Sequence, residues 1–393
     1  MRSPDPPRAP IAILVHSLNE GGAQQRLVAL ANRFASRGHA VDYVAVSGAG
    51  TAGRQLGEDV RQLGLVPNGK HPWVRIMAGF GALRRYLALR QPAVLMAGSN
   101  RVHAVAAAAC AGLARPPLLV LRIAGHPLRQ LPWSRPWKRV RETWLRPVER
   151  WALGRADLVV AVSKECAAAT ATMILDRTRV TSIPNPTITE EFRASLALPA
   201  DHRWFDAADE GGDPVILGIG RISTSKNFET LVEAVATVNR SLPVRLILLG
   251  DGKRRGAIEA LVARRGLGDR VELMGHVSPV GGWLARADLL VSSSLWEGSP
   301  GVIIEAFEAG LPVVATACPG GSVELLESGT GGMLVPMRDP AAMARAIIAM
   351  LGRPRDRAAV RALALPYQDD GRADLAYLAA IEAAAKRKAA ALE

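Results

Sequence analysis

The sequence contains little of what several protein classes require. Its 393 residues include only three cysteines, Cys110, Cys166 and Cys318. They lie unevenly spaced in apolar segments, so they predict small core residues in a reducing compartment and no disulfide framework. No ligand spacing typical of a metal site is present, and nothing indicates a cofactor. We therefore expect a protein that binds neither a structural metal nor a prosthetic group.

Long apolar segments are also missing. The uncharged run at residues 103–114 is alanine-rich and too short to cross the roughly 30 Å of hydrocarbon in a bilayer. The first eight residues lack the apolar stretch that a signal peptide needs. Together these absences predict a cytoplasmic protein without a membrane-spanning helix.

Acidic residues are scarce in the first half of the chain. Residues 1–185 contain 26 Lys and Arg against 10 Asp and Glu, whereas residues 186–393 contain 23 against 26. The net charge of +13 thus comes entirely from the first half. This asymmetry predicts that the first half meets an anionic surface or ligand.

Short apolar runs alternate with segments of helical periodicity along the chain. We expect strands at residues 11–15, 41–46, 93–96, 118–123, 158–162, 215–219, 246–249, 271–274, 288–292 and 313–315. We expect helices at residues 23–37, 227–240, 253–265, 279–286, 301–309 and 372–392. The alternation predicts an α/β protein whose parallel sheets are covered by helices on both faces.

The length and one polar stretch predict two domains. A chain of 393 residues exceeds what one hydrophobic core usually serves. Prolines and acidic residues between residues 184 and 214 interrupt the pattern, which then restarts. We expect an N-terminal Rossmann-like domain at 1–189, a linker at 190–213, a C-terminal Rossmann-like domain at 214–366 and a terminal helical segment at 367–393.

Two charged loops follow strands of the second half. Gly220 begins a turn that carries Arg221 and Lys226, directly after the strand expected at 215–219. Glu297 and Glu305 flank the start of another helix, after the strand expected at 288–292. Either loop alone is also typical of solvated surface. Because ligands of open α/β sheets bind beyond the carboxyl ends of the strands, the two loops together predict one site.

The start of the helix expected at 301–309 is suited to an anion. We expect Ser299 to cap this helix through its hydroxyl and Pro300 to occupy the first turn. The N–H groups of Gly301 and Val302 would then face the ligand, where the helix dipole favours negative charge. This arrangement predicts binding of a phosphate group.

The charged side chains add to that prediction. Arg221 and Lys226 supply the positive charge that a diphosphate needs, and Glu305 can accept hydrogen bonds from a ribose diol. No convincing Asp-x-Asp metal site follows a strand, which favours neutralisation of the diphosphate without a metal. The pattern therefore predicts a site for a nucleotide diphosphate attached to a polyol.

These motifs, in this order, resemble those of the retaining GT-B glycosyltransferases of glycosyltransferase family 4. The resemblance covers roughly residues 11–340 and implies two Rossmann-like domains that face each other across a cleft. It rests on Gly21-Gly-Ala-Gln24, Val162-Ser-Lys164, Ile183-Pro-Asn-Pro186, Gly220-Arg221 with Lys226, Leu249-Gly-Asp-Gly252, Val271-Glu-Leu-Met-Gly-His-Val277, and residues 297–315.

The resemblance implies roles for individual residues. Arg221 and Lys226 would neutralise the departing diphosphate, Glu305 would bind the ribose hydroxyls, and Glu297 would contact the donor sugar. His126 follows a strand where many members carry a histidine against the donor sugar, although a single histidine there also suits a polar loop. We expect Glu297, Arg221, Lys226 and His126 to be catalytic.

Further residues would bind the donor through their backbone. Gly21 and Gly22 would let the first domain approach the diphosphate without a Cβ clash. Gly250 belongs to the same donor site, and His276 and Val277 would contact the nucleobase. Two positions depart from the common pattern: Gln24 replaces a frequent acidic residue, and Ser299 replaces a frequent aromatic, which affects the fit of the donor sugar.

Residues 132–151 form a separate signal, with four Trp interleaved among six basic residues. This composition is typical of a segment at an anionic membrane surface, where rings lie at headgroup depth. The alternative is that the Trp side chains are core and the Arg side chains a solvated face. No nucleic-acid motif accompanies the segment, so nucleic acid is not an expected partner.

We therefore predict a metal-independent retaining glycosyltransferase that takes a nucleotide sugar, most simply a UDP-sugar. The basic first half favours a lipid-linked saccharide or envelope glycan as acceptor, reached from the cytoplasmic face of a bacterial membrane. Two alternatives stay open at this point. One is other chemistry on the same scaffold, such as epimerisation or transfer to a small soluble acceptor, and the other is a catalytically silent scaffold protein.

Overall fold

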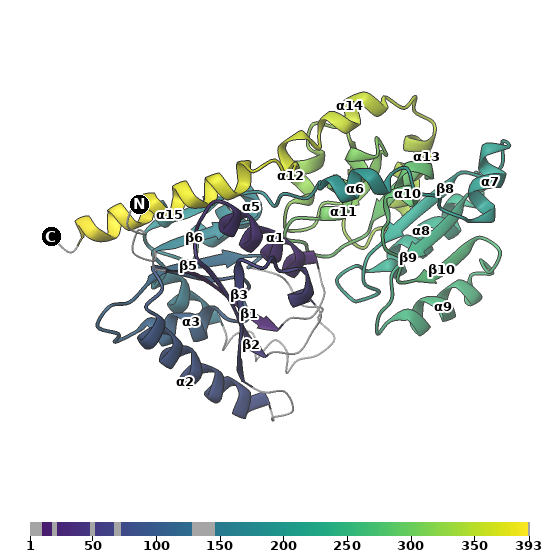
Figure 1. The fold of residues 1–393 in the computed structure, drawn as a ribbon. Helices are drawn as coiled ribbons and strands as arrows, with labels where there is room; N and C mark the ends of the chain where they lie inside the picture. Colours follow the sequence, from purple (N-terminus) through teal and green to yellow (C-terminus); the bar gives the residue numbers. More distant parts are fainter. Residues whose placement is uncertain (1–9, 18–21, 48–51, 67–71, 128–145, 392–393) are drawn as a thin grey trace. The chain divides into compact units, whose positions relative to one another are not determined.

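The chain folds into two compact units, each built on one parallel sheet (Figure 1). This computed structural model describes residues 10–17, 22–47, 52–66, 72–127 and 146–391. Unit 1 combines Met1–Asn185 with Asp370–Glu393, and unit 2 is Pro186–Asp369. The chain therefore passes between the units twice, after Asn185 and after Asp369.

Unit 1 contains a seven-stranded sheet in the order β3-β2-β1-β4-β5-β6-β7, with every neighbouring pair parallel. Its strands are β1 (Ile11–Ser17), β2 (Val41–Ser47), β3 (Val60–Val66), β4 (Val94–Ala97), β5 (Leu118–Ile123), β6 (Leu158–Ala161) and β7 (Val180–Ser182). Its helices include α1 (Gly22–Ser36), α2 (Pro72–Arg90), α3 (His103–Cys110), residues 146–154, α5 (Lys164–Ala171) and α15 (Arg372–Ala390), with 3-10 turns η1 (Ala52–Gln55) and η2 (Arg177–Arg179).

Two hydrophobic clusters cover the two faces of this sheet. Successive strand residues such as Tyr43 and Val44 belong to different clusters, as the two-residue period of a strand requires. The terminal helix α15 contributes Tyr377 and Ile381 to the cluster that also holds α1. An ion pair between Arg37 and Asp374 joins the same two helices. The last helix of the chain is thus part of the core of unit 1.

Unit 2 contains a six-stranded parallel sheet in the order β10-β9-β8-β11-β12-β13. Its strands are β8 (Val215–Ile219), β9 (Arg245–Leu249), β10 (Val271–Gly275), β11 (Leu289–Ser292), β12 (Val313–Thr316) and β13 (Gly332–Val335). Its helices are α6 (Glu190–Ser195), α7 (Arg203–Asp209), α8 (Phe228–Val238), α9 (Arg255–Arg264), α10 (Gly281–Arg286), α11 (Gly301–Glu308), α12 (Ser322–Leu326), α13 (Pro340–Leu351), α14 (Arg357–Ala362) and the 3-10 turn η3 (Leu365–Tyr367).

The predicted α/β class with parallel sheets is confirmed, and each predicted strand lies within one residue or two of an observed one. The three cysteines are buried and free, as expected, and burial raises the pKa of Cys110 and Cys318 to about 11. Three strands were not predicted. β3 is at an edge of its sheet with an exposed middle, β7 has three residues, and β13 begins at a glycine, so none shows a clear apolar run.

Residues 190–213, expected to form a linker, fold within unit 2. Thr189 caps α6 by accepting a hydrogen bond from the N–H of Phe192, and His202 caps α7 through the N–H of Trp204. The rings of Trp204 and Phe205 are buried against Trp283 and the sheet. Most polar residues of this segment lie on its exposed faces. Because they dominate its composition, the sequence did not predict that Trp204 and Phe205 are buried.

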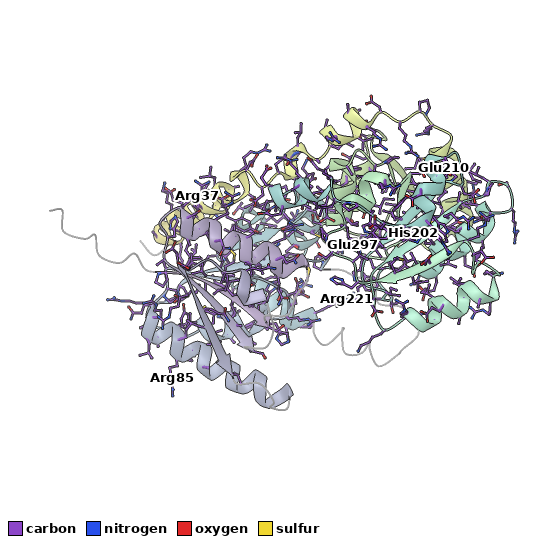
Figure 2. The ribbon with its side chains drawn as sticks, turned by 45° about the vertical axis from the view of Figure 1, so that its right-hand side comes forward. Arg37, Arg85, His202, Glu210, Arg221 and Glu297 are labelled. Atoms are coloured by element: carbon purple, nitrogen blue, oxygen red, sulfur yellow. The ribbon has the colours of Figure 1, made fainter. Side chains whose placement is uncertain are left out.

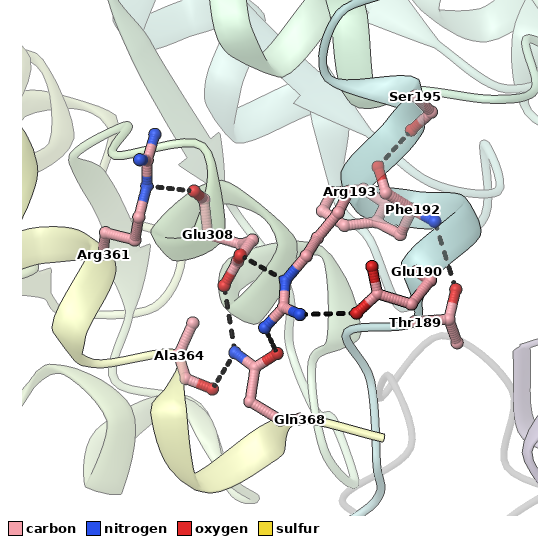
Figure 3. A network of polar contacts seen from close by, with 9 residues as sticks. All are labelled: Thr189, Glu190, Phe192, Arg193, Ser195, Glu308, Arg361, Ala364 and Gln368. Atoms are coloured by element: carbon pink, nitrogen blue, oxygen red, sulfur yellow. Dashed lines mark hydrogen bonds and ion pairs between the residues drawn. The ribbon is translucent and has the colours of Figure 1, made fainter. Parts of the chain in front are cut away.

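The two segments that pass between the units are fixed at both ends. In unit 2, Ile188 and Gln368 pair as a parallel bridge, and Arg193 on α6 binds both Glu308 at the end of α11 and Gln368 (Figure 3). The Arg193 Nε atom lies 3.0 Å from Glu308 Oε1. In unit 1, the buried Arg122 donates to Asn185 Oδ1 at 2.6 Å and to the hydroxyl of Tyr377 at 3.2 Å.

Candidate functional site

Three strand ends of unit 2 meet in a group of glycines. Gly220, Gly250 and Gly275 follow or end β8, β9 and β10, and their φ angles are +143°, +140° and +78°. A Cβ atom on Gly250 would lie 2.1 Å from the carbonyl oxygen of Gly220, and the N–H of Gly250 donates to Gly275 O at 2.6 Å. Only glycine fits this close backbone contact. The carboxyl edge of the sheet therefore presents backbone close to any bound ligand.

Lys226 and Glu297 are brought together by the loops after β8 and β11. Lys226 Nζ donates to Glu297 Oε1 at 2.6 Å, and both side chains are mostly buried, with 20% and 15% of their surface exposed. A Cβ atom on Gly220 would lie 2.7 Å from Lys226 Cε, so Gly220 leaves room for the lysine side chain. The sequence singled out both residues for one site, and the structure brings their side chains into direct contact.

Backbone and hydroxyl groups hold the two loops against each other. The N–H of Leu295 donates to Ser225 O at 2.7 Å, and the hydroxyl of Ser293 donates to Lys226 O at 2.8 Å. The hydroxyl of Ser294 donates to Glu297 Oε1 at 2.6 Å, on the same oxygen that Lys226 contacts. The carboxylate of Glu297 is therefore fixed by two donors from two loops.

A third loop supports the backbone of Glu297. The N–H of Glu297 donates to Pro319 O at 2.9 Å, and the N–H of Gly321 donates to Gly298 O at 3.0 Å. Gly320 has a φ of +122°, and a Cβ atom there would lie 2.1 Å from the carbonyl oxygen of Glu297. The loop after β12 therefore determines where Glu297 lies.

Arg221 and His276 are exposed residues at the same edge of the sheet. Arg221 follows Gly220 and is labelled with Glu297 in Figure 2. Within the part of the chain that the structure describes, the Arg221 guanidinium makes no hydrogen bond or ion pair. Val277, next to His276, packs partly buried against the core. Arg221 thus presents a positive charge that the described residues do not neutralise.

The start of α11 differs from the prediction. The helix begins at Gly301, and its N-cap is Pro300, with ψ of 88° and no side-chain hydrogen bond to the helix. Ser299 is one position too early for its hydroxyl to reach the N–H groups of the first turn, so the prediction of a Ser299 cap with Pro300 in the first turn was wrong. The N–H groups of Gly301 and Val302 have no acceptor among the described residues. This end of the helix therefore keeps free donors and positive dipole charge.

The two glutamates on α11 have different surroundings. Glu305 is half-buried one turn into the helix. Glu308 is buried at the opposite end, where it accepts from Arg193 and from Gln368, and its carbonyl accepts from Arg361 (Figure 3). The sequence analysis missed Glu308 because its spacing from Glu305 suits a solvated helix face as well as a buried one.

His126 belongs to unit 1 and follows β5. It is buried, its Nε2 atom lies 3.8 Å from Glu165 Oε1 on α5, and its Nδ1 atom has no hydrogen-bond partner among the described residues. Burial lowers the pKa of His126, and the nearby Glu165 partly opposes this shift. The imidazole of His126 is therefore neutral at neutral pH.

Gly22 is the first residue of α1, whereas Gly21 lies outside the described residues.

Sequence reasoning also missed residues that support the site. Ser293, Ser294 and Thr316 are fully buried, and the hydroxyl of Thr316 donates to Ser294 O. The run of three serines at the end of β11 was a usable signal, because hydroxyl groups at a strand end can be donors to the following loop.

Among the described residues, no group of three or more His, Cys, Asp or Glu side chains is arranged to hold a metal ion.

The structure describes residues 146–151 of the basic Trp-rich segment, whereas residues 132–145 lie outside the described residues. Trp151 is therefore the one Trp of this segment whose burial can be stated. Trp151 and Val148, on the helix at 146–154, are 41% and 43% exposed, so the alternative that these side chains are core is wrong for this part. The Arg155 guanidinium lies 4.9 Å from the centroid of the Trp151 ring.

No helix in the described ranges is both long and apolar enough to cross a membrane.

Two family profiles match the chain. Residues 213–353 match the family described as Glycosyl transferases group 1, and residues 20–191 match Glycosyltransferase Family 4. The first match contains Lys226 and the segment from Glu297 to Glu305, and the second contains His126. The chain belongs to the group 1 glycosyltransferases and has the GT-B fold. The predicted family and fold are thereby confirmed.

Curated relatives of this chain are glycosyltransferases of different processes, as their names state. The chain is 36% identical to the lipopolysaccharide core biosynthesis glycosyltransferase LpsE of Rhizobium meliloti over 155 residues. These aligned residues are 39% of this chain and 41% of LpsE. The chain is 32% identical over 247 residues to the alpha-D-kanosaminyltransferase of Streptomyces kanamyceticus, covering 56% and 59%. The glycosyltransferase thus matches less than two thirds of the length of each of these relatives.

Solved structures share the complete fold. The sucrose-phosphate synthase of Thermosynechococcus elongatus superposes with a TM-score of 0.74 at 22% identity, covering 98% of this chain and all of that one. The Anabaena protein HepE in complex with UDP-glucose gives a TM-score of 0.71 at 20% identity, with the same coverage of 98% and 100%. At this level of identity the likeness shows the fold alone.

Proposed function

We propose that this glycosyltransferase moves a sugar from a UDP-sugar to a glycan acceptor, with retention of the anomeric configuration and without a metal ion. The observation that carries the proposal is the contact of 2.6 Å between Lys226 and Glu297 at the carboxyl edge of the unit 2 sheet. Arg221 and the free N–H groups at the start of α11 lie on loops of the same edge. This edge therefore combines positive charge, backbone donors and a fixed carboxylate.

Each group has a task in the transfer. Breaking the bond between sugar and nucleotide builds negative charge on the departing diphosphate, which Lys226, Arg221 and the first N–H groups of α11 stabilise. Glu305, one turn into α11, binds the ribose hydroxyls. Glu297 contacts the donor sugar through the carboxylate oxygen that Lys226 leaves unused. Lys226, Arg221 and the start of α11 all lie at this edge before the donor arrives, so positive charge is available where the diphosphate departs.

Other predicted residues complete the donor site in this proposal. His276 and Val277 contact the nucleobase after β10, and Gly250 and Ser299 border the diphosphate and the sugar. In this proposal the backbone of Gly22, the first residue of α1, approaches the diphosphate together with Gly21, which lies outside the described residues, and neutral His126 hydrogen-bonds the donor sugar. The Nδ1 atom of His126 has no hydrogen-bond partner among the described residues, which supports this role because a buried nitrogen without a partner is costly. Residues 1–189 would form the acceptor-side domain and residues 214–366 the donor domain.

The donor is proposed as a UDP-sugar because structures of HepE contain UDP and UDP-glucose. For the acceptor we favour a lipid-linked saccharide or envelope glycan, supported by the similarity to LpsE and by the basic first half. The similarity to the 2-deoxystreptamine glucosyltransferase of Streptomyces kanamyceticus, 30% identical over 223 residues, supports a second candidate, transfer to a small soluble acceptor. Epimerisation of the donor and a catalytically silent protein are the remaining alternatives.

Product analysis tests the proposal. The purified protein is incubated in EDTA with UDP-, GDP- and ADP-sugars and with either a lipid extract or a set of amino-sugar acceptors. We expect release of UDP with a new α-linked product, whose anomeric configuration NMR compares with that of the donor. An inverted product contradicts retention, and loss of turnover in EDTA contradicts metal independence. Binding of UDP without any turnover favours the silent alternative.

Exposed Trp151 supports a peripheral membrane location on the cytoplasmic face. Val148 and Trp151 are exposed on the helix at 146–154, and Arg150 of that helix and Arg155 just after it are exposed too. Exposed apolar side chains near positive charges suit an anionic membrane surface. We expect the protein to float with vesicles containing anionic lipid at low salt and the double variant Val148→Ser, Trp151→Ser to float less. Absence of binding by the unchanged protein at low salt would contradict this location.

A further inference from the structure

We propose that Ser294 is a positioning residue that lets Lys226 leave Glu297 for the donor diphosphate. The inference rests on the proposed function, because it assumes that a diphosphate binds beside Lys226. Lys226 Nζ and Ser294 Oγ both donate to Glu297 Oε1, each at 2.6 Å. The lysine must turn toward the diphosphate to neutralise it, and the carboxylate then loses one of its two donors.

The loss would be costly without Ser294. Glu297 is only 15% exposed, so water reaches it poorly, and a buried carboxylate without a donor is strongly disfavoured. Among the described residues, no other side chain or N–H contacts its carboxylate oxygens. When Lys226 moves away, Ser294 is the one described residue that still donates to this carboxylate. A hydrogen bond to a carboxylate that has no other donor stabilises it more than the same bond to a carboxylate that has two donors. The bond from Ser294 to Glu297 is therefore stronger with the diphosphate bound, when Lys226 has left, than in the free protein.

The surroundings of Ser294 suit such a role. Its side chain is buried, its carbonyl accepts from the hydroxyl of Thr316 on β12, and Leu295 is tied by its N–H to Ser225. The hydroxyl of Ser294 therefore stays in place whether or not Lys226 is in contact with Glu297. Ser293 holds the backbone of Lys226 through its own hydroxyl, so the lysine side chain can turn while its Cα remains fixed.

Glu297 also keeps one oxygen for the sugar in this arrangement. Both donors contact Oε1, and the described residues leave Oε2 without a donor. A sugar hydroxyl can donate to Oε2 while Ser294 holds Oε1. Ser294 thus orients the carboxylate toward the donor sugar, and it acts through Glu297 without touching the substrate.

Calorimetry with UDP and Ser294→Ala tests the inference. We expect the affinity for UDP to fall several-fold, and by no more than about ten-fold, the worth of a full hydrogen bond to a charged group, because only the part of that bond gained when Lys226 leaves counts toward UDP binding. In the Glu297→Ala background, Ser294→Ala is expected to change UDP affinity less than two-fold, because the carboxylate is absent. Ser292→Ala is the matched control: it is a buried serine two positions earlier whose hydroxyl contacts neither Glu297 nor Lys226.

The outcomes separate the inference from the proposed function. If the unchanged protein binds UDP and Ser294→Ala has no larger effect than Ser292→Ala, or the same effect with and without Glu297, the inference is overturned. If the unchanged protein binds no nucleoside diphosphate, the proposed function fails and the inference with it. Ser294→Cys, which keeps the side-chain size with a weaker donor, replaces the alanine variant should that variant not fold, and an unchanged UDP affinity there also overturns the inference.

Discussion

Lys226 and Glu297 are 71 residues apart in sequence, yet Lys226 Nζ lies 2.6 Å from Glu297 Oε1. They follow β8 and β11, which are neighbours in the unit 2 sheet, so the parallel order of the strands places both loops at one edge. A mostly buried ion pair contributes little to stability compared with apolar residues of the same size. Its value here lies in holding a cation and a carboxylate ready at the place where a nucleotide sugar would react.

The loop after β12 gives a first prediction, because Gly320 supports Glu297. In Gly320→Ala the new Cβ atom would lie 2.1 Å from Glu297 O at a φ of +122°. We expect unit 2 to lose on the order of 3 kcal/mol of its free energy of unfolding, from overpacking together with backbone strain. Urea denaturation measures this loss.

Gly329→Ala is the control for that variant. Gly329 also has a positive φ of +73°, but nothing lies within 4 Å of its added Cβ atom. Only the backbone strain of about 1 kcal/mol is expected there. Equal losses in the two variants would show that the contact of Gly320 with Glu297 is unimportant.

The Arg193 network gives a second prediction. Glu308→Ala removes the acceptor of Arg193 Nε and one of the two acceptors of the buried Gln368 amide, whereas the Arg193 side chain, 40% exposed, can still meet water (Figure 3). We expect a loss of about 2 kcal/mol in the unfolding of unit 2, the usual cost of removing hydrogen bonds to a charged group. Chemical denaturation followed by tryptophan fluorescence measures it.

Glu190→Ala is its control. Glu190 contacts the same arginine at 2.7 Å, but its side chain is 83% exposed. Exposed pairs of this kind contribute about 0.5 kcal/mol or less. A larger loss for Glu190→Ala than for Glu308→Ala would contradict the view that the buried part of the network carries its stability.

His103 gives a third prediction, on pH dependence. It opens α3, its Nε2 atom lies 3.1 Å from Arg122 O, and burial lowers its pKa to about 4. The unfolded chain therefore takes up a proton near pH 6.5, whereas the folded chain does so only near pH 4. Stability is full above pH 6.5 and is lost as the pH falls toward 4, by an amount on the order of 3 kcal/mol.

Denaturation of the unchanged protein and of His103→Gln between pH 7.5 and pH 4.5 measures this effect. The variant cannot take up a proton at this position, so its stability should fall less steeply over the same range. The lowered pKa of His126 acts in the same direction and leaves a residual slope. Parallel curves for the two proteins would mean that His103 does not titrate as described.

The sequence predicted the alternating architecture and the charged loops, because apolar strands and motif residues at strand ends are local signals. It did not predict β3 and β13, whose exposed positions and glycine hide the strand pattern. It placed the cap of α11 at Ser299, although Pro300 ends the extended segment. Ser294 and Glu308 were missed because their importance comes from residues far away in sequence, Lys226 for one and Arg193 for the other.

Titration of UDP into the unchanged protein and into Lys226→Ala, with EDTA present, tests the proposed donor site most directly. We predict that the unchanged protein binds UDP in EDTA and that Lys226→Ala binds it at least 100-fold more weakly, because its main cation for the diphosphate is gone. Equal affinity in the two proteins, or binding that disappears in EDTA, would contradict a metal-free donor site built on Lys226.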